Sequence, residues 1–98
     1  MTLDDVLQDI HPLDDELVSY ERKYNVLSKT FYEGYLNGQE PRDDARVQDW
    51  MAWASAYRLW LRRCELYRAA IAQLRAGSDS MSTIIGKTAR HDAIVVPA

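Results

Sequence analysis

The sequence predicts an all-α protein, and three observations support this. Residues 43–76 include neither glycine nor proline, and their apolar side chains recur at intervals of three and four. Two shorter segments before them, residues 12–24 and 28–36, show the same spacing. Asn25, Gly38 and Gly77, which favour the ends of helices, separate these segments. We therefore expect a helical hairpin or small bundle with one long helix near its C-terminal end.

The first two helices are expected on either side of Pro12. Residues 2–10 have apolar side chains at helical spacing, and Pro12 should end this helix because proline lacks an N–H and clashes with the preceding turn. The same proline suits the first turn of a helix over residues 12–24, where acidic residues favour the helix dipole. The apolar stripe of this second helix is Leu13, Leu17, Tyr20 and Tyr24.

Asn25 then marks a break, and Ser28 is expected to cap a third helix that ends at Asn37 and Gly38. Asp43 or Asp44 should cap the long helix, which would reach about 50 Å over residues 43–76. The chain's 98 residues suit a single domain, expected over residues 1–76.

Residues 77–98 are expected to form a C-terminal arm. They are mostly small and polar, and their β-branched islands at Ile84–Ile85 and at residues 94–96 do not favour a helix. We expect this arm to be mobile when free, or extended and ordered against a partner.

The long helix carries two overlapping apolar rows. The first has the spacing of a coiled-coil seam and consists of Trp53, Tyr57, Trp60, Cys64, Tyr67, Ile71 and Leu74. The second consists of Val47, Trp50, Ala54, Tyr57, Leu61 and Cys64. The single stripe offered by the N-terminal helices covers one row, so we expect another chain to cover the other.

We assign the second row to the chain's own Leu17, Tyr20, Tyr24 and Phe31, and the first row to a protein interface. Two alternatives stay open at this point. The two rows can exchange roles, or the N-terminal helices can fold over both sides of the long helix and complete a monomer core.

Catalytic, cofactor and metal sites are not expected. His11 and His91 do not stand in a metal-ligand spacing, and the acidic pairs Asp14–Asp15 and Asp43–Asp44 are typical of first helical turns. Cys64 is the only cysteine and is interpreted as an apolar filler. The chain shows neither a signal peptide nor an apolar run long enough to span a bilayer, so we expect a cytoplasmic protein. Because the sequence offers no catalytic constellation, we do not expect an enzyme.

The charges suggest an alternative function. The net charge is only −3, but the charged side chains of residues 1–21 are all acidic, whereas five arginines face a single glutamate over residues 50–76. This asymmetry is typical of two parts of one fold that partly neutralise each other. The alternative is a nucleic-acid-binding or regulatory module that uses Arg58, Arg62, Arg63 and Arg68, although no nucleic-acid-binding motif accompanies them.

The sequence resembles small helical proteins of prokaryotic toxin–antitoxin-type gene pairs. The resemblance covers about half of the chain, and it lies in Leu17, Tyr20, Glu21, Tyr24, Ser28, Phe31, Tyr35, Gly38, Trp53, Tyr57 and Leu61. The chain departs from that pattern at Asn25, where the family often has glycine, and in its long arm. The resemblance implies an antitoxin-like role in binding a cognate protein such as a toxin. Together with the apolar rows, it predicts a non-catalytic protein–protein interaction module that forms a homo-oligomer, most simply a dimer.

Overall fold

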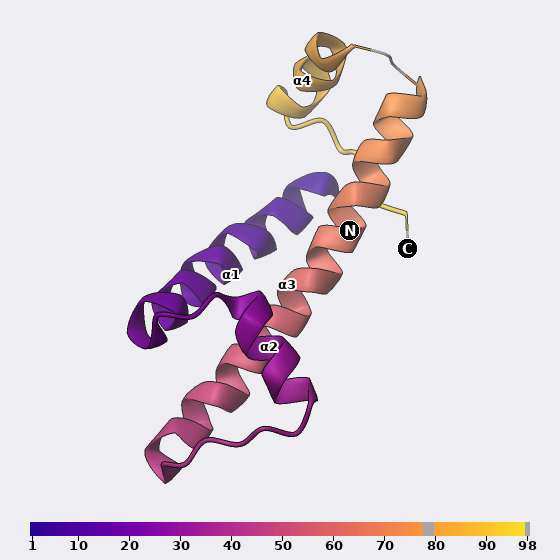
Figure 1. Ribbon diagram of the computed structural model, residues 1–98. Helices are drawn as coiled ribbons and strands as arrows, with labels where there is room; N and C mark the ends of the chain where they lie inside the picture. Colours follow the sequence, from indigo (N-terminus) through magenta and orange to yellow (C-terminus); the bar gives the residue numbers. More distant parts are fainter. Residues whose placement is uncertain (78–79, 98) are drawn as a thin grey trace. The chain divides into compact units, whose positions relative to one another are not determined.

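The chain is all-α, as the sequence predicts. The computed structural model describes residues 1–77 and 80–97 and has four helices in this part of the chain (Figure 1). They are α1 (Leu3–Tyr24), α2 (Ser28–Leu36), α3 (Asp44–Gly77) and α4 (Met81–Ala89). None of these helices is long and apolar enough to cross a membrane. The chain divides into a middle unit, residues 11–61, and a terminal unit, residues 1–10 together with the described residues from 62 onward.

The break predicted at Pro12 is wrong, because α1 runs through this residue. Pro12 removes the hydrogen bond that the carbonyl of Gln8 would otherwise accept, at a typical cost of about 3 kcal/mol. Both residues are exposed, so water can reach that carbonyl. The apolar positions meanwhile keep an uninterrupted spacing of three and four from one end of α1 to the other, namely Leu3, Val6, Ile10, Leu13, Leu17, Tyr20 and Tyr24. Five of these seven side chains are buried, and their burial outweighs the local cost of the proline.

The other boundaries of the middle unit agree closely with the predictions. Asn25 adopts a left-handed backbone conformation with φ of 55°, and Gly38 follows α2 with φ of 81°. The Asp43 carboxylate accepts a hydrogen bond from the Ala45 N–H at 2.9 Å, so Asp43 caps the long helix. That helix spans 44–77, one residue from the expected range at each end.

Ser28 does not have its predicted role as a helix cap. Ser28 is the first residue of α2, and Leu27 occupies the cap position. The Leu27 side chain makes no capping hydrogen bond. The Ser28 side chain is buried and takes part in a polar network with α1 and α3, described below.

The prediction that the C-terminal arm forms no helix is wrong for residues 81–89, which form α4. The Ser80 hydroxyl accepts a hydrogen bond from the Thr83 N–H at 3.0 Å, a cap that is typically worth about 1 kcal/mol. This cap and the burial of Ile84 offset the small helix penalties of the β-branched residues. Residues 78, 79 and 98 lie outside the described part of the chain. The division into a domain and an arm at Gly77 stays a prediction.

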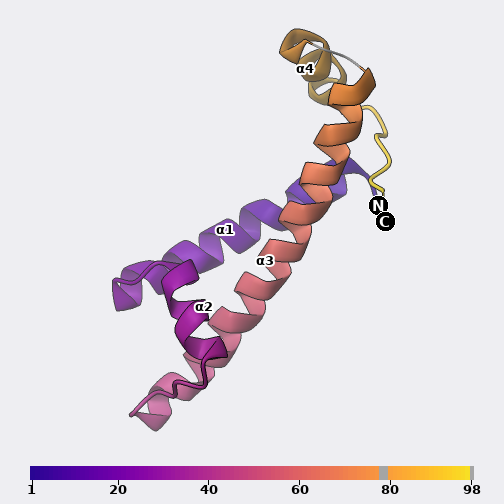
Figure 2. The ribbon, with the colours of Figure 1, turned by 45° about the vertical axis from the view of Figure 1, so that its right-hand side comes forward.

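In the terminal unit, residues from both ends of the chain lie side by side (Figure 2). The N–H of Leu3 donates to the carbonyl of Ile94 at 2.9 Å, and the N–H of Val96 donates to the carbonyl of Met1 at 3.1 Å. The His91 ring nitrogen Nδ1 lies 3.0 Å from an Asp4 carboxylate oxygen. The extended part of the arm is thus ordered against the start of the same chain.

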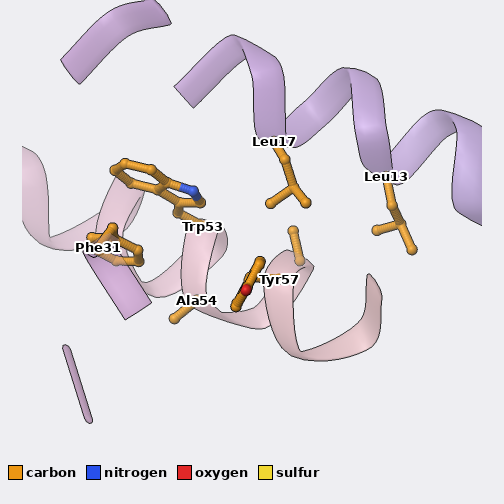
Figure 3. Close-up of a cluster of buried hydrophobic side chains, with 7 residues drawn as sticks. Leu13, Leu17, Phe31, Trp53, Ala54 and Tyr57 are labelled. Carbon is orange, nitrogen blue, oxygen red and sulfur yellow. The ribbon is translucent and has the colours of Figure 1, made fainter. Parts of the chain in front are cut away.

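The core of the middle unit forms around Trp53. Leu13 and Leu17 project from α1 toward α3, and the Phe31 ring of α2 lies against the Trp53 indole (Figure 3). The Phe31 and Trp53 rings are parallel, with centroids 3.9 Å apart. Three helices therefore meet at one tryptophan side chain, which is only 1% exposed.

Candidate protein interaction surfaces

The structure divides the predicted interface row of α3 into a buried and a partly exposed part. Trp53 is fully buried and Tyr57 is 9% exposed, both in the core of the middle unit. The prediction that another chain covers these two residues is wrong, because the chain's own α1 and α2 cover them. Tyr20 and Tyr24 each stack on Trp53 with ring centroids 5.7 Å away. In this part of α3 the chain also covers residues of the second row, because Ala54 is only 1% exposed and Trp50 and Leu61 pack against the same core.

A polar network holds Trp53 in place. Its indole N–H donates to the Ser28 hydroxyl oxygen at 2.9 Å. The Ser28 hydroxyl and backbone N–H both donate to the Glu21 carboxylate, at 2.7 and 2.9 Å. A carboxylate of α1 thus satisfies the first N–H of α2, where the helix dipole favours negative charge. Sequence reasoning missed this role of Glu21, since the spacing of seven residues across a turn is not a recognised capping pattern.

Trp60, the third residue of the predicted interface row, is half-buried and bound by its own chain. Its indole N–H donates to the Asp14 carboxylate at 2.6 Å. Asp14 was expected only to favour the first turn of a helix, so its role as an acceptor was not predicted. The only sequence signal was the general need of a tryptophan N–H for an acceptor.

The distal part of the row, Cys64, Tyr67, Ile71 and Leu74, lies in the terminal unit and is partly exposed. Tyr67 and Ile71 line a groove of about 190 Å³ together with Leu3, Leu7, Met81 and Ile85. Tyr67 is 37% exposed, and Met81 and Ile85 of α4 are 53% and 54% exposed. We call this feature the terminal groove. It brings residues of the predicted interface together with α4, which the sequence analysis did not predict.

A second concave surface lies in the middle unit. This aromatic pocket has a volume of about 330 Å³, and its walls include Phe31, Tyr35 and Trp50. The Trp50 ring meets the Phe31 ring edge-on, with centroids 5.3 Å apart. Gln39 and Arg46 supply polar groups to its lining. Trp50 was expected to be covered by the chain itself, and it packs against the middle-unit core while remaining partly exposed in this pocket.

The structure does not bring the four arginines of the nucleic-acid alternative together as one free group. Arg58 lies in the middle unit and donates to the Tyr32 hydroxyl oxygen at 3.2 Å, which raises the pKa of Arg58. Arg63 lies in the terminal unit and donates to the Asp9 carboxylate at 2.8 Å. Arg62 and Arg68 are exposed. Two of the four side chains are therefore engaged within the protein.

The Asp49 carboxylate is the main ionic centre of the middle unit. It accepts a hydrogen bond from Lys23 at 2.5 Å and one from the Tyr24 hydroxyl at 2.6 Å. The bond from Lys23, and then the bond from Tyr24, lower the pKa of Asp49. The same bonds raise the pKa values of Lys23 and Tyr24. The charged carboxylate therefore links the end of α1 to α3.

His11 and His91 do not lie in a metal-binding arrangement. Over residues 1–77 and 80–97, no three or more His, Cys, Asp and Glu side chains form a group that could hold a metal ion. No family model matches the chain, and neither a curated protein nor a solved structure matches it.

Replacing Ser28 with alanine should destabilise the protein by about 1–3 kcal/mol, because it leaves the buried Trp53 N–H without an acceptor. Ser55→Ala, at an exposed position of α3, is the matched control and should change the free energy of unfolding by less than about 0.5 kcal/mol. Urea unfolding of the two variants checks this. Equal stabilities would contradict the role given to the Ser28 hydroxyl.

The lowered pKa of Asp49 predicts a contribution to acid sensitivity. A carboxylate whose pKa is lower in the folded state stabilises the protein above its unfolded pKa, near 3.8, and this contribution is lost as the pH falls through the folded value. Asp49→Asn should therefore reduce the drop in melting temperature between about pH 7 and about pH 2.5. Asp15→Asn, at an exposed position of α1, serves as the control. An unchanged acid-induced drop in the Asp49 variant would refute the prediction.

Proposed function

We propose that this chain is a non-catalytic protein–protein interaction module that self-associates through the distal half of α3 and binds a cognate protein in an antitoxin-like manner. The observation that carries the proposal is the terminal groove. There, three apolar side chains from α3 and α4, Tyr67, Met81 and Ile85, are more than one-third exposed around one concavity. Large exposed apolar side chains that gather in this way are typical of interaction sites.

A second copy of the chain is the occupant we propose for this groove. Cys64, Tyr67, Ile71 and Leu74 continue the seam spacing of three and four that lets two helices interdigitate. Such a contact is self-complementary, so the same residues serve both copies of a symmetric dimer. Arg75 at the groove supplies a polar edge, as is usual around the apolar centre of an interface.

The antitoxin-like part of the proposal rests on the resemblance. In the structure, most residues that carry it belong to the middle-unit core or pack against it, among them Leu17, Phe31 and Trp53. Others are Glu21 and Ser28, which form the polar network. The resemblance therefore concerns residues that stabilise the fold, while other residues, on the surface, would determine which partner binds. Co-expression with the product of the adjacent gene tests this part, and failure of the two proteins to co-purify would contradict it.

Ile85→Lys should weaken self-association, because it places a charge in the apolar terminal groove. Sedimentation at micromolar concentrations should show the wild type as an oligomer and this variant shifted toward the monomer. Leu36→Lys is the matched control, since Leu36 is an exposed apolar residue at the end of α2 and does not line the groove. A wild type that remains monomeric, or equal effects of the two variants, would contradict self-association through this groove.

A further inference from the structure

The aromatic pocket of the middle unit is preformed. Its lining includes Phe31 and Trp53, which are buried and stacked on each other, so this part of the wall cannot easily move. Trp50 and Tyr35 extend the wall toward solvent, and both rings pack against Phe31. The volume of about 330 Å³ falls at the lower end of the range for ligand pockets, which is about 300–1,000 Å³. Such a pocket accepts one large apolar side chain without first having to order its own residues.

The pocket also has a cationic group at Arg46. The Arg46 guanidinium lies 5.9 Å from the centroid of the Tyr24 ring, within the range of a cation–π contact. Among the described residues it has no carboxylate at ion-pair distance. Asp49, three residues further along α3, is already bound by Lys23 and Tyr24. The guanidinium of Arg46 therefore forms no ion pair with a carboxylate in the described part of the chain.

Gln39 adds a neutral polar group to the same pocket. Its backbone N–H donates to the carbonyl of Gly34 at 3.2 Å, and its side chain lies over this glycine. A Cβ added at Gly34 would stand only 3.3 Å from the Gln39 side-chain oxygen, so glycine allows this close approach. The amide can both donate and accept hydrogen bonds, which suits the backbone of a bound peptide.

We propose that the aromatic pocket binds a large apolar side chain of a partner protein, next to an acidic residue whose carboxylate pairs with Arg46. This inference rests on the proposed function in taking the ligand to be a protein. Aromatic walls favour an apolar or aromatic anchor, and a guanidinium favours a carboxylate beside it. The pocket would thereby select acidic partner segments over basic ones.

In the described part of the chain, a second copy offers no exposed large apolar side chain directly next to an acidic residue in the sequence. The exposed large apolar residues of the described part of the chain are Met1, Val18, Val26, Leu27, Leu36, Val47, Met51, Leu59, Tyr67, Met81, Ile85 and Val95. None of them stands beside an aspartate or a glutamate in the sequence. The charge of Arg46 therefore favours a different protein as the occupant of the aromatic pocket.

Titration of the full-length protein with blocked dipeptides, followed by ¹H–¹⁵N NMR, tests this inference. The probes are acetyl-Asp-Phe-amide, acetyl-Asn-Phe-amide, acetyl-Lys-Phe-amide and acetyl-Asp-Ala-amide. The aspartate–phenylalanine peptide should shift the Trp50 indole and Gln39 side-chain signals. It should bind about threefold or more tighter than its asparagine counterpart, as expected for a partly exposed ion pair. The lysine peptide should bind more weakly still, and the alanine peptide should cause no shift.

Arg46→Gln should abolish the preference for aspartate over asparagine. Arg22→Gln, at an exposed position of α1 away from the pocket lining, is the matched control and should keep the preference. Equal binding of the differently charged peptides, shifts confined to other residues, or no shift at millimolar peptide would overturn the inference. Peptide binding to the aromatic pocket does not depend on the terminal groove. Self-association can therefore persist when the peptides do not bind, and the peptides can bind when the protein does not self-associate.

Discussion

The middle unit depends on how one buried indole is held. Trp53 is stacked by rings from α1 and α2, and its N–H is bonded to Ser28, whose hydroxyl is bonded in turn to Glu21. Burial of a large aromatic side chain supplies much of the stabilisation of a small core, but only when its polar N–H also finds an acceptor. The network meets both needs with one serine and one glutamate, and it sets where α2 begins.

This arrangement limits where the protein can bind others. Trp53 and Tyr57 of the predicted interface row are buried inside the fold. A partner must therefore bind side chains that remain exposed elsewhere. The terminal groove and the aromatic pocket are two concave surfaces with exposed apolar side chains, one in each unit, and they differ in their lining. The terminal groove is lined mainly by aliphatic residues from α1, α3 and α4, whereas the aromatic pocket combines Trp50 and Tyr35 with the charge of Arg46. The first suits self-association, and the second suits a distinct acidic partner.

Periodicity predicted the helices of this chain well because burial on one face decides helix position more strongly than individual residues do. The long helix was placed to within one residue at each end, whereas Pro12 and the β-branched residues near Ile84 misled because their local penalties are small beside burial and capping. Spacing could not reveal which residues of the two rows of α3 the N-terminal helices cover. That choice depends on contacts such as Glu21 with Ser28 and Asp14 with Trp60, which join residues on different helices.

Hydrogen exchange of the three tryptophan indole protons, resolved by NMR, tests the central place of Trp53 most directly. Exchange of a buried, hydrogen-bonded N–H requires the surrounding structure to open, so its rate reports the stability of that structure. The Trp53 indole proton should exchange the slowest of the three and become exposed only when the middle unit unfolds. The indole protons of Trp50 and Trp60, whose side chains are only partly buried, should exchange sooner. A Trp53 proton that exchanges as fast as that of Trp50 would contradict the buried network on which this account rests.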